Sequence, residues 1–337
     1  MIGISGVPAF LKSVLSAPAI SALVGSGGTF WMPPQRSTFA SEVDTLFYFI
    51  YWICVFFFML ILALAVGFLL KYRRRGEEIV VQKSAHHSTF LELIWSGIPL
   101  LLVLAIFVMG FRGYINMATP PAGAYEVQVT GQKWNWSFTY PNGYIDSELH
   151  VPSGEPVTLV MTSQDVIHSF FVPELRVKQD VVPGRYSRVW FETTEPFEGT
   201  VFCAEYCGTS HSEMQARFVA HDPAEFDRWM ERAARWWEGM SPADIGATVY
   251  QKRGCQQCHS VDGMGGIGPT LQGVFGSRRT FADGSTGTVD ENYIRQSMLE
   301  PRAKVVQGFD PVMPTFQGRL KEEEIAGIIA YMKSLSQ

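Results

Sequence analysis

Cysteine and net charge are both scarce in this chain of 337 residues. It has five cysteines, a formal net charge of −5, and only 18% charged residues. So few cysteines do not form a disulfide framework, and the absence of a large positive field argues against nucleic acid as a partner. Hydrophobic residues, in contrast, make up 47% of the chain and are unevenly spread. The length allows two or three domains.

Four of the five cysteines form two close pairs, which favours metal or cofactor binding. The first pair lies in Cys203-Ala-Glu-Tyr-Cys207-Gly-Thr-Ser-His211-Ser-Glu-Met214. Thiol, imidazole and thioether groups are soft ligands, which suit copper better than magnesium or calcium. A second imidazole, His168, stands upstream, where a β-strand pattern ends. A disulfide or a zinc site are the competing interpretations, but neither uses both histidines and Met214.

The second pair forms Cys255-Gln-Gln-Cys258-His259, the C-x-x-C-H pattern of c-type haem attachment. A zinc ribbon would need another cysteine pair nearby, and no cysteine follows Cys258. Met313 lies roughly 54 residues after His259 and is the candidate second axial ligand of the haem iron. Met264 and Met298 compete for that role, but only Met313 is followed by proline. Met/His ligation raises the reduction potential, which suits an electron carrier.

Two long apolar runs precede these motifs. Leu46–Leu70 has roughly 25 uncharged residues and Leu93–Phe111 roughly 19, so each can cross a bilayer. The basic segment 71–75 between them predicts a cytoplasmic loop, with the N-terminus and everything after about residue 113 on the other side. Cys54, alone in the first run, is expected to be a small packing residue. Residues 1–40 suit either a signal-like segment or a peripheral helix on the membrane.

Short strands are predicted after the second apolar run. Period-two alternation and turn signals predict strands at Tyr125–Val129, Ser147–Val151, Val157–Thr162, Ser187–Phe191 and Gly199–Phe202. Such a series is typical of a small sandwich or barrel. A helix from Asp222 to about Trp237 and a break at Glu238–Pro242 follow. A terminal helix, Lys321–Leu335, is predicted to pack on the helix that precedes Cys255.

The first motif, C-x-E-x-C-x-x-x-H-x-x-M, resembles the binuclear CuA site of cytochrome c oxidase subunit II. The resemblance implies a cupredoxin fold with the copper ligands in loops at one end. It also implies two copper ions held by bridging thiolates of Cys203 and Cys207, imidazoles of His168 and His211, a weak bond from Met214 and the backbone carbonyl of Glu205. The carboxylate of Glu205 would help to hold a magnesium ion shared with subunit I.

Two further residues stand at positions that matter in this family. Trp134 occupies the place of the tryptophan through which electrons enter the copper centre, although alternating aromatic residues in a strand also suit core packing. Glu92, in Phe90-Leu-Glu-Leu-Ile-Trp95, occupies the place of a glutamate at the entrance of a proton path into subunit I. A carboxylate that reaches out to lipid headgroups is the alternative for Glu92.

The C-terminal segment resembles small class I cytochromes c, in which Pro269 would orient the haem ligand. The predicted fold is therefore multidomain. It comprises an N-terminal segment (1–40), a two-helix transmembrane hairpin (41–115), an all-β cupredoxin-like Greek-key domain (120–220), a helix and linker (221–242), and an all-α class I cytochrome c domain (243–337). This order is similar to subunit II of caa₃-type oxidases.

The resemblance implies the electron-input subunit of a proton-pumping oxidase in the bacterial cytoplasmic membrane, with both redox domains outside. Electrons would pass from a soluble cytochrome c through haem c and CuA to haem a. Oxygen reduction would belong to the haem a₃–CuB site of subunit I, and subunit III and membrane lipid are further partners. The alternatives are an electron-input subunit of a nitric-oxide reductase and a tethered copper-handling protein. The haem motif disfavours the second alternative, and Glu92 with Glu205 disfavours the first.

Overall fold

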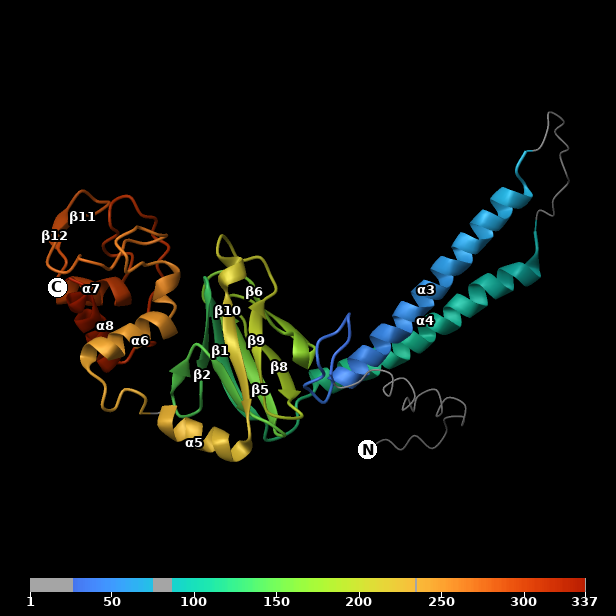
Figure 1. Cartoon of the computed structure of the whole chain (residues 1–337), viewed down its shortest axis with the longest axis horizontal. Coiled ribbons are helices and arrows are strands. Elements are labelled where there is room, and N and C mark those ends of the chain that lie inside the picture. The colour runs from blue at the N-terminus through green and yellow to red at the C-terminus, as the bar shows by residue number, and fades with distance from the viewer. Residues whose placement is uncertain (1–26, 75–86, 234, 337) are drawn as a thin grey trace. The chain divides into compact units, whose positions relative to one another are not determined.

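The computed structural model describes residues 27–74, 87–233 and 235–336 (Figure 1). The chain divides into two compact units. One runs to Thr119 and includes Glu174–Arg176, and the other contains the remaining residues from Pro120 onward. Most of the predicted segment 1–40, and most of the predicted cytoplasmic loop, lie outside the described residues.

The first unit contains two long helices, α3 (Ala40–Lys71) and α4 (Thr89–Ala118). They are antiparallel, because Leu46 near the start of α3 packs against Gly110 near the end of α4 (Figure 1). Their most apolar windows have mean hydropathies of 3.1 and 2.4 and are not buried within the chain, so both helices are long and apolar enough to span a membrane. Cys54 is exposed on α3 within this chain.

A buried ion pair holds the start of α3. Arg176 Nε lies 2.7 Å from Asp44 Oδ1, and the two side chains are only 5% and 0% exposed. The same guanidinium donates through Nη2 to the backbone carbonyl of Pro33 at 2.7 Å. The sequence places Asp44 in the first turn of a helix, where its charge favours the dipole, but the structure gives it a specific partner far along the chain.

The second unit begins with a cupredoxin-like β-sandwich, as predicted. Its strands are β1 (Tyr125–Gln132), β2 (Asn135–Thr139), β3 (Ile145–Asp146), β4 (Leu149–Pro152), β5 (Pro156–Ser163), β6 (His168–Val172), β7 (Val177–Val181), β8 (Ser187–Glu192), β9 (Phe197–Cys203) and β10 (Gln215–His221). One sheet has the order β3-β2-β1-β5-β8 and the other β4-β10-β9-β6-β7. Trp136 and Phe138 are fully buried in its core.

Strands β2, β3, β6, β7 and β10 were not among the five strands predicted from the sequence pattern. The position of His168 is corrected accordingly: it is the first residue of β6 and does not stand at the end of a strand. Strand β6 pairs with β7 and β9, which holds His168 close to Cys203 at the end of β9. Pairing between distant segments therefore brings the upstream histidine to the copper motif.

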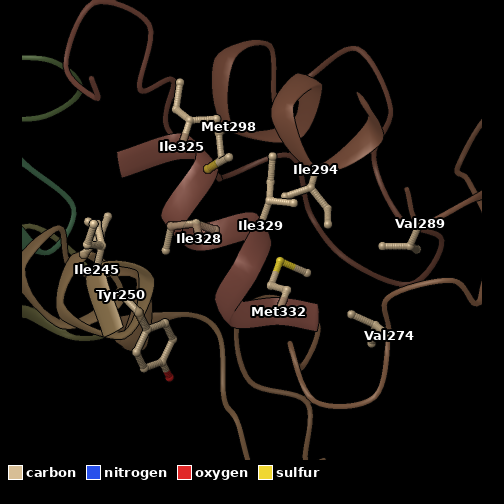
Figure 2. Packing of buried hydrophobic residues seen from close by; sticks show 11 residues of the cluster. Ile245, Tyr250, Val274, Val289, Ile294, Met298, Ile325, Ile328, Ile329 and Met332 are labelled. Atoms are coloured by element: carbon tan, nitrogen blue, oxygen red, sulfur yellow. The ribbon is translucent and has the colours of Figure 1, made fainter. Parts of the chain in front are cut away.

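Helix α5 (Pro223–Ala233) follows the sandwich and ends earlier than the predicted Trp237. The haem domain then contains α6 (Pro242–Lys252), a short hairpin of β11 (Arg278–Thr280) and β12 (Thr286–Thr288), α7 (Glu291–Leu299) and α8 (Glu322–Ser334). Ile325, Ile328, Ile329 and Met332 on α8 face a shared apolar cluster with Ile294 and Met298 of α7 (Figure 2). The terminal helix packs on α6 as predicted, where Gly246 directly contacts Gly327.

Polar contacts join the haem domain to the sandwich within the second unit. Lys252 Nζ lies 3.1 Å from Asp146 Oδ2, and the Asp146 side chain is only 1% exposed. Arg253 Nη1 donates to the carbonyl of Ile145 at 3.1 Å. Arg319 Nη2 donates to Ser137 Oγ at 2.6 Å. These contacts join the haem domain to β3 and β2 of the sandwich.

Candidate copper and haem sites

Soft donor atoms converge at one end of the sandwich, in the loop between β9 and β10. Cys203 Sγ lies 3.8 Å from Cys207 Sγ and 3.8 Å from His168 Nδ1. Cys207 Sγ lies 3.5 Å from His211 Nδ1 and 3.8 Å from Met214 Sδ. The carbonyl oxygen of Glu205 lies 3.3 Å from Cys203 Sγ. The structure thus gathers all six predicted ligand groups.

The geometry of the two thiols fits a shared metal centre better than a disulfide. Their separation of 3.8 Å is nearly twice a disulfide bond of about 2.05 Å. His168, Cys203 and Cys207 are all buried, and their donor atoms lie within 4.8 Å of one another. Two thiolates, two imidazoles and a thioether form a donor set that suits copper. The residues present therefore fit the copper centre that the motif predicts.

Asp165 orients His168 and was missed as a functional residue. Its Oδ1 lies 2.9 Å from His168 Nε2, which leaves Nδ1 facing the thiol of Cys203. A carboxylate behind a metal-binding histidine fixes the ring and makes it a stronger ligand. The sequence offers a usable signal, since Asp165 stands three residues before His168 in the same short segment.

The two thiols differ in acidity in the metal-free chain. Burial opposes ionisation of Cys203, but hydrogen bonds from His168 and from backbone groups outweigh it and lower its pKa to about 6. Burial and the neighbouring Cys203 raise the pKa of Cys207 to about 12. Cys203 is therefore the more acidic of the two thiols. A bound cation would favour the thiolate form of both.

Trp134 packs directly on the copper loop. A Cβ atom at Gly208 would lie 3.2 Å from the Trp134 ring, and Gly208 has a φ of +122°, a conformation that favours glycine. Trp134 is 9% exposed, so it is mostly buried against the residue that follows Cys207. The backbone N–H of its neighbour Lys133 donates to Asp165 Oδ2 at 2.8 Å. The predicted electron-entry residue is thus next to the predicted copper ligands.

The two predicted glutamates stand apart from the buried donor cluster. The side chain of Glu205 is exposed, and only its carbonyl faces a thiol. Glu92 lies in the first turn of α4, where its Oε1 is 2.6 Å from His87 Nδ1. The His87 side chain is exposed at this contact.

The haem domain contains a large apolar cavity with about 1520 Å³ of empty space, part of it open to solvent. Its walls include Cys255, Cys258, His259, Pro269 and Met313. The lining is mostly apolar, as the walls of a pocket for an apolar cofactor usually are. The cysteine pair forms a short 3₁₀ turn after α6, and His259 follows it outside any helix.

His259 is fixed through one ring nitrogen. Its Nδ1 lies 2.7 Å from the carbonyl oxygen of Pro269, so Nδ1–H donates and Nε2 remains available as a ligand. Burial lowers the pKa of His259, which keeps the ring neutral and suited to a metal. A Cβ at Gly268 would lie 2.6 Å from the imidazole, so a glycine is required where the loop crosses the ring. These residues fit a covalently attached haem.

Comparisons with known proteins identify the families that match each part of the chain. Family models described as "Cytochrome C oxidase subunit II, transmembrane domain", "Cytochrome C oxidase subunit II, periplasmic domain" and "Cytochrome c" match residues 26–112, 143–220 and 243–336. The chain is 34% identical over 290 residues to cytochrome c oxidase subunit 2 of Alkalihalophilus pseudofirmus, covering 82% of each chain. It is 32% identical over 247 residues to cytochrome c oxidase subunit 2 of Synechocystis sp., covering 59% of this chain and 74% of the relative.

A solved structure also aligns with part of the chain. The crystal structure of the periplasmic domain of subunit II of cytochrome oxidase from Bradyrhizobium japonicum is 29% identical, with a TM-score of 0.33. The alignment covers 35% of this chain and 98% of that chain.

Proposed function

The chain belongs to the family of cytochrome c oxidase subunit II, with a cytochrome c domain at its C-terminal end, and on that premise we propose that it carries electrons from a soluble cytochrome c to subunit I. As a family member it is a membrane subunit of a haem-copper oxidase with periplasmic domains. Copper and haem c are its cofactors. When bound, these two groups supply one-electron transfer, and the residues of the chain position them.

One observation carries the proposal: the haem cavity and the copper loop meet at the same hairpin. Lys133 and Asn135 line the haem cavity, and Trp134 between them packs on Gly208 of the copper loop. An electron that leaves the haem cavity towards this hairpin therefore has a short path through the Trp134 ring. Two redox sites on one chain also keep donor and acceptor at high effective concentration.

The individual ligand roles belong to the same proposal. Cys203 and Cys207, together with His168, His211, Met214 and the carbonyl of Glu205, would hold two copper ions. Cys255 and Cys258 would attach the haem, and His259 and Met313 would bind its iron. The short distances between the soft donor atoms support the copper set. The shared cavity wall supports the haem set.

Two carboxylates extend the proposal to the other subunits of a bacterial cytoplasmic-membrane oxidase. The exposed carboxylate of Glu205 is available to a magnesium ion shared with subunit I. Glu92, paired with His87 at the start of α4, is proposed as the entrance of a proton path into subunit I. Haem a and the haem a₃–CuB site then belong to subunit I, with subunit III, a soluble cytochrome c and lipid as further partners.

The test is a metal count and an EPR spectrum on the purified complex that contains the full chain. We expect one covalent haem c per chain and two copper ions that share one unpaired electron. Zinc, a single isolated copper ion or no metal in the loop would contradict the relay. Haem a in the same complex is expected for an oxidase, and its absence would favour the nitric-oxide reductase or the copper-handling alternative.

A further inference from the structure

Arg319 carries a charge that no carboxylate of the described residues balances. It lies just before α8, and burial lowers its pKa to about 10, with the nearby cation Arg253 as a second cause. Its guanidinium donates instead to the neutral oxygens of Ser137 and Gln132. A partly buried guanidinium without a counter-charge is unfavourable unless another anion lies near it.

The neighbouring cations show the contrast. Arg253 Nη2 lies 2.6 Å from Glu324 Oε1, and Lys252 Nζ lies 3.1 Å from Asp146 Oδ2. Both cations at this side of the haem domain therefore have a carboxylate of the chain. Arg319 is the one that contacts only neutral oxygens among the described residues.

The position of Arg319 points to the missing anion. It lines the haem cavity beside Phe316 and Leu320, and its guanidinium lies 6.0 Å from the Phe316 ring centroid. A guanidinium has five N–H donors, of which two are used by Ser137 and Gln132, so donors remain for a further acceptor. Haem carries two propionate groups, and planar carboxylates are the anions that arginine binds best.

We propose that Arg319 binds a propionate of the haem and, through Ser137 and Gln132, connects that haem to the β1–β2 hairpin. Ser137 belongs to β2 and Gln132 to β1, the two strands that Lys133 and Trp134 connect. Arg319 therefore fixes the distance between the haem and Trp134 while its charge stabilises the reduced haem. The inference rests on the proposed attachment of haem c at Cys255 and Cys258.

Lys133, Arg279 and Lys304 also line the cavity and are the competing cations. Lys133 belongs to the β1–β2 hairpin itself, and Lys304 Nζ lies 5.6 Å from the Phe281 ring centroid. Among the described residues, Arg279 and Lys304 make no hydrogen bond to that hairpin, whereas Arg319 joins the haem domain to it. The competing residues supply variants that separate a specific propionate contact from general positive charge.

The experiment uses the whole oxidase complex with Arg319→Gln, Arg319→Lys, Arg279→Gln and Arg302→Gln. Arg302 is exposed and does not line the cavity, so its variant is a matched loss of one positive charge. Covalent haem per chain, the haem c midpoint potential and the rate of electron transfer from haem c to copper are measured. We expect Arg319→Gln to keep its haem, to shift the haem equilibrium toward the oxidised form by roughly tenfold, and to slow the transfer. A tenfold shift is about 59 mV for one electron.

Three outcomes overturn the proposal. They are an unchanged midpoint in Arg319→Gln with normal haem content, an equal shift in Arg302→Gln, and a larger shift in Arg279→Gln. If Arg319→Gln carries no haem, Arg319→Lys decides, because lysine keeps the charge and loses the forked geometry. If Arg319→Lys has the wild-type midpoint potential and the wild-type transfer rate, the proposal is also overturned. A missing copper signal or missing haem a would contradict the proposed function instead, so the two failures are distinguishable.

Discussion

His168 and His259 are each held through one ring nitrogen, but their partners differ. The carboxylate of Asp165 contacts His168, whereas the backbone carbonyl of Pro269 contacts His259. Side-chain contacts raise the pKa of His168 despite its burial, and burial lowers the pKa of His259. The copper site thus takes His168 from the first position of β6 and its other donors from the segment that joins β9 to β10. The haem cavity instead takes its walls from segments between residues 253 and 332, together with the β1–β2 hairpin.

The strongest test of this contrast removes each histidine. We expect His168→Ala to lose the mixed-valence copper signal while the haem remains attached. His259→Ala should keep its covalent haem through two thioether bonds, lose the axial bond to iron, and retain the copper signal. EPR and metal counts on the full complex measure both results. His221→Gln, another histidine of the sandwich, serves as the control, and a mixed-valence signal that survives in His168→Ala would contradict the copper assignment.

Asp165→Asn tests the carboxylate that contacts His168, since His259 contacts a backbone carbonyl instead. We expect copper affinity to fall about 10- to 100-fold, the usual effect of losing a carboxylate behind a metal-binding histidine. Haem content should not change. Competition with a copper chelator measures the affinity. Glu198→Gln, an exposed carboxylate of β9, is the matched control, and equal affinities in the two variants would show that Asp165 does not act through His168.

Met313 is the predicted methionine ligand of the haem iron, and Met214 is the predicted weak methionine ligand of copper. Met313→Leu should lower the haem c midpoint potential, because Met/His ligation raises it. Met214→Leu should leave the chain folded, since leucine has a similar volume, and shift the copper potential by a smaller amount. Redox titrations of the two centres give both values. An unchanged copper potential would remove Met214 from the ligand set.

Gly246→Ala is expected to have the smallest effect and to act on one region only. The added Cβ would lie 2.0 Å from the carbonyl oxygen of Gly327, so α6 and α8 must separate. Overpacking of this kind typically costs about 1–3 kcal/mol. Thermal unfolding followed by haem absorbance should therefore move to lower temperature, while the copper spectrum keeps its form. A copper spectrum that changes along with it would show that the two sites are not independent.

The sequence was most informative where chemistry is concentrated in a short segment. Cys203–Met214 contains five of the predicted copper ligands, which the soft donor types and the family resemblance indicated together, and the structure places their donor atoms together. The apolar runs and most strand positions followed from composition and period. The role of each ligand, the role of Glu92 and the positions of the domain boundaries stay predictions.

Features that depend on distant pairing were not predictable. Strand β6, His168-Ser-Phe-Phe-Val, lacks clean alternation because both faces are largely covered, so its period gives no strand signal. Arg319 and Ser137 are 182 residues apart, and nothing local distinguishes Arg319 from a surface arginine. Asp44 likewise resembles an ordinary acidic residue of a first helical turn. A single charged residue whose partner is distant in the sequence produces no periodic pattern, so the pairing cannot be predicted from the sequence.

The pairing of Asp44 with Arg176 also sets an order of events during synthesis. The two residues are 132 positions apart, so the helix head emerges from the ribosome long before its cation exists. At about 5–20 residues per second, the interval is roughly 7 to 26 s. During that time the Asp44 carboxylate lacks the Arg176 guanidinium. The Asp44–Arg176 ion pair can therefore form only after the segment between β6 and β7 has been translated.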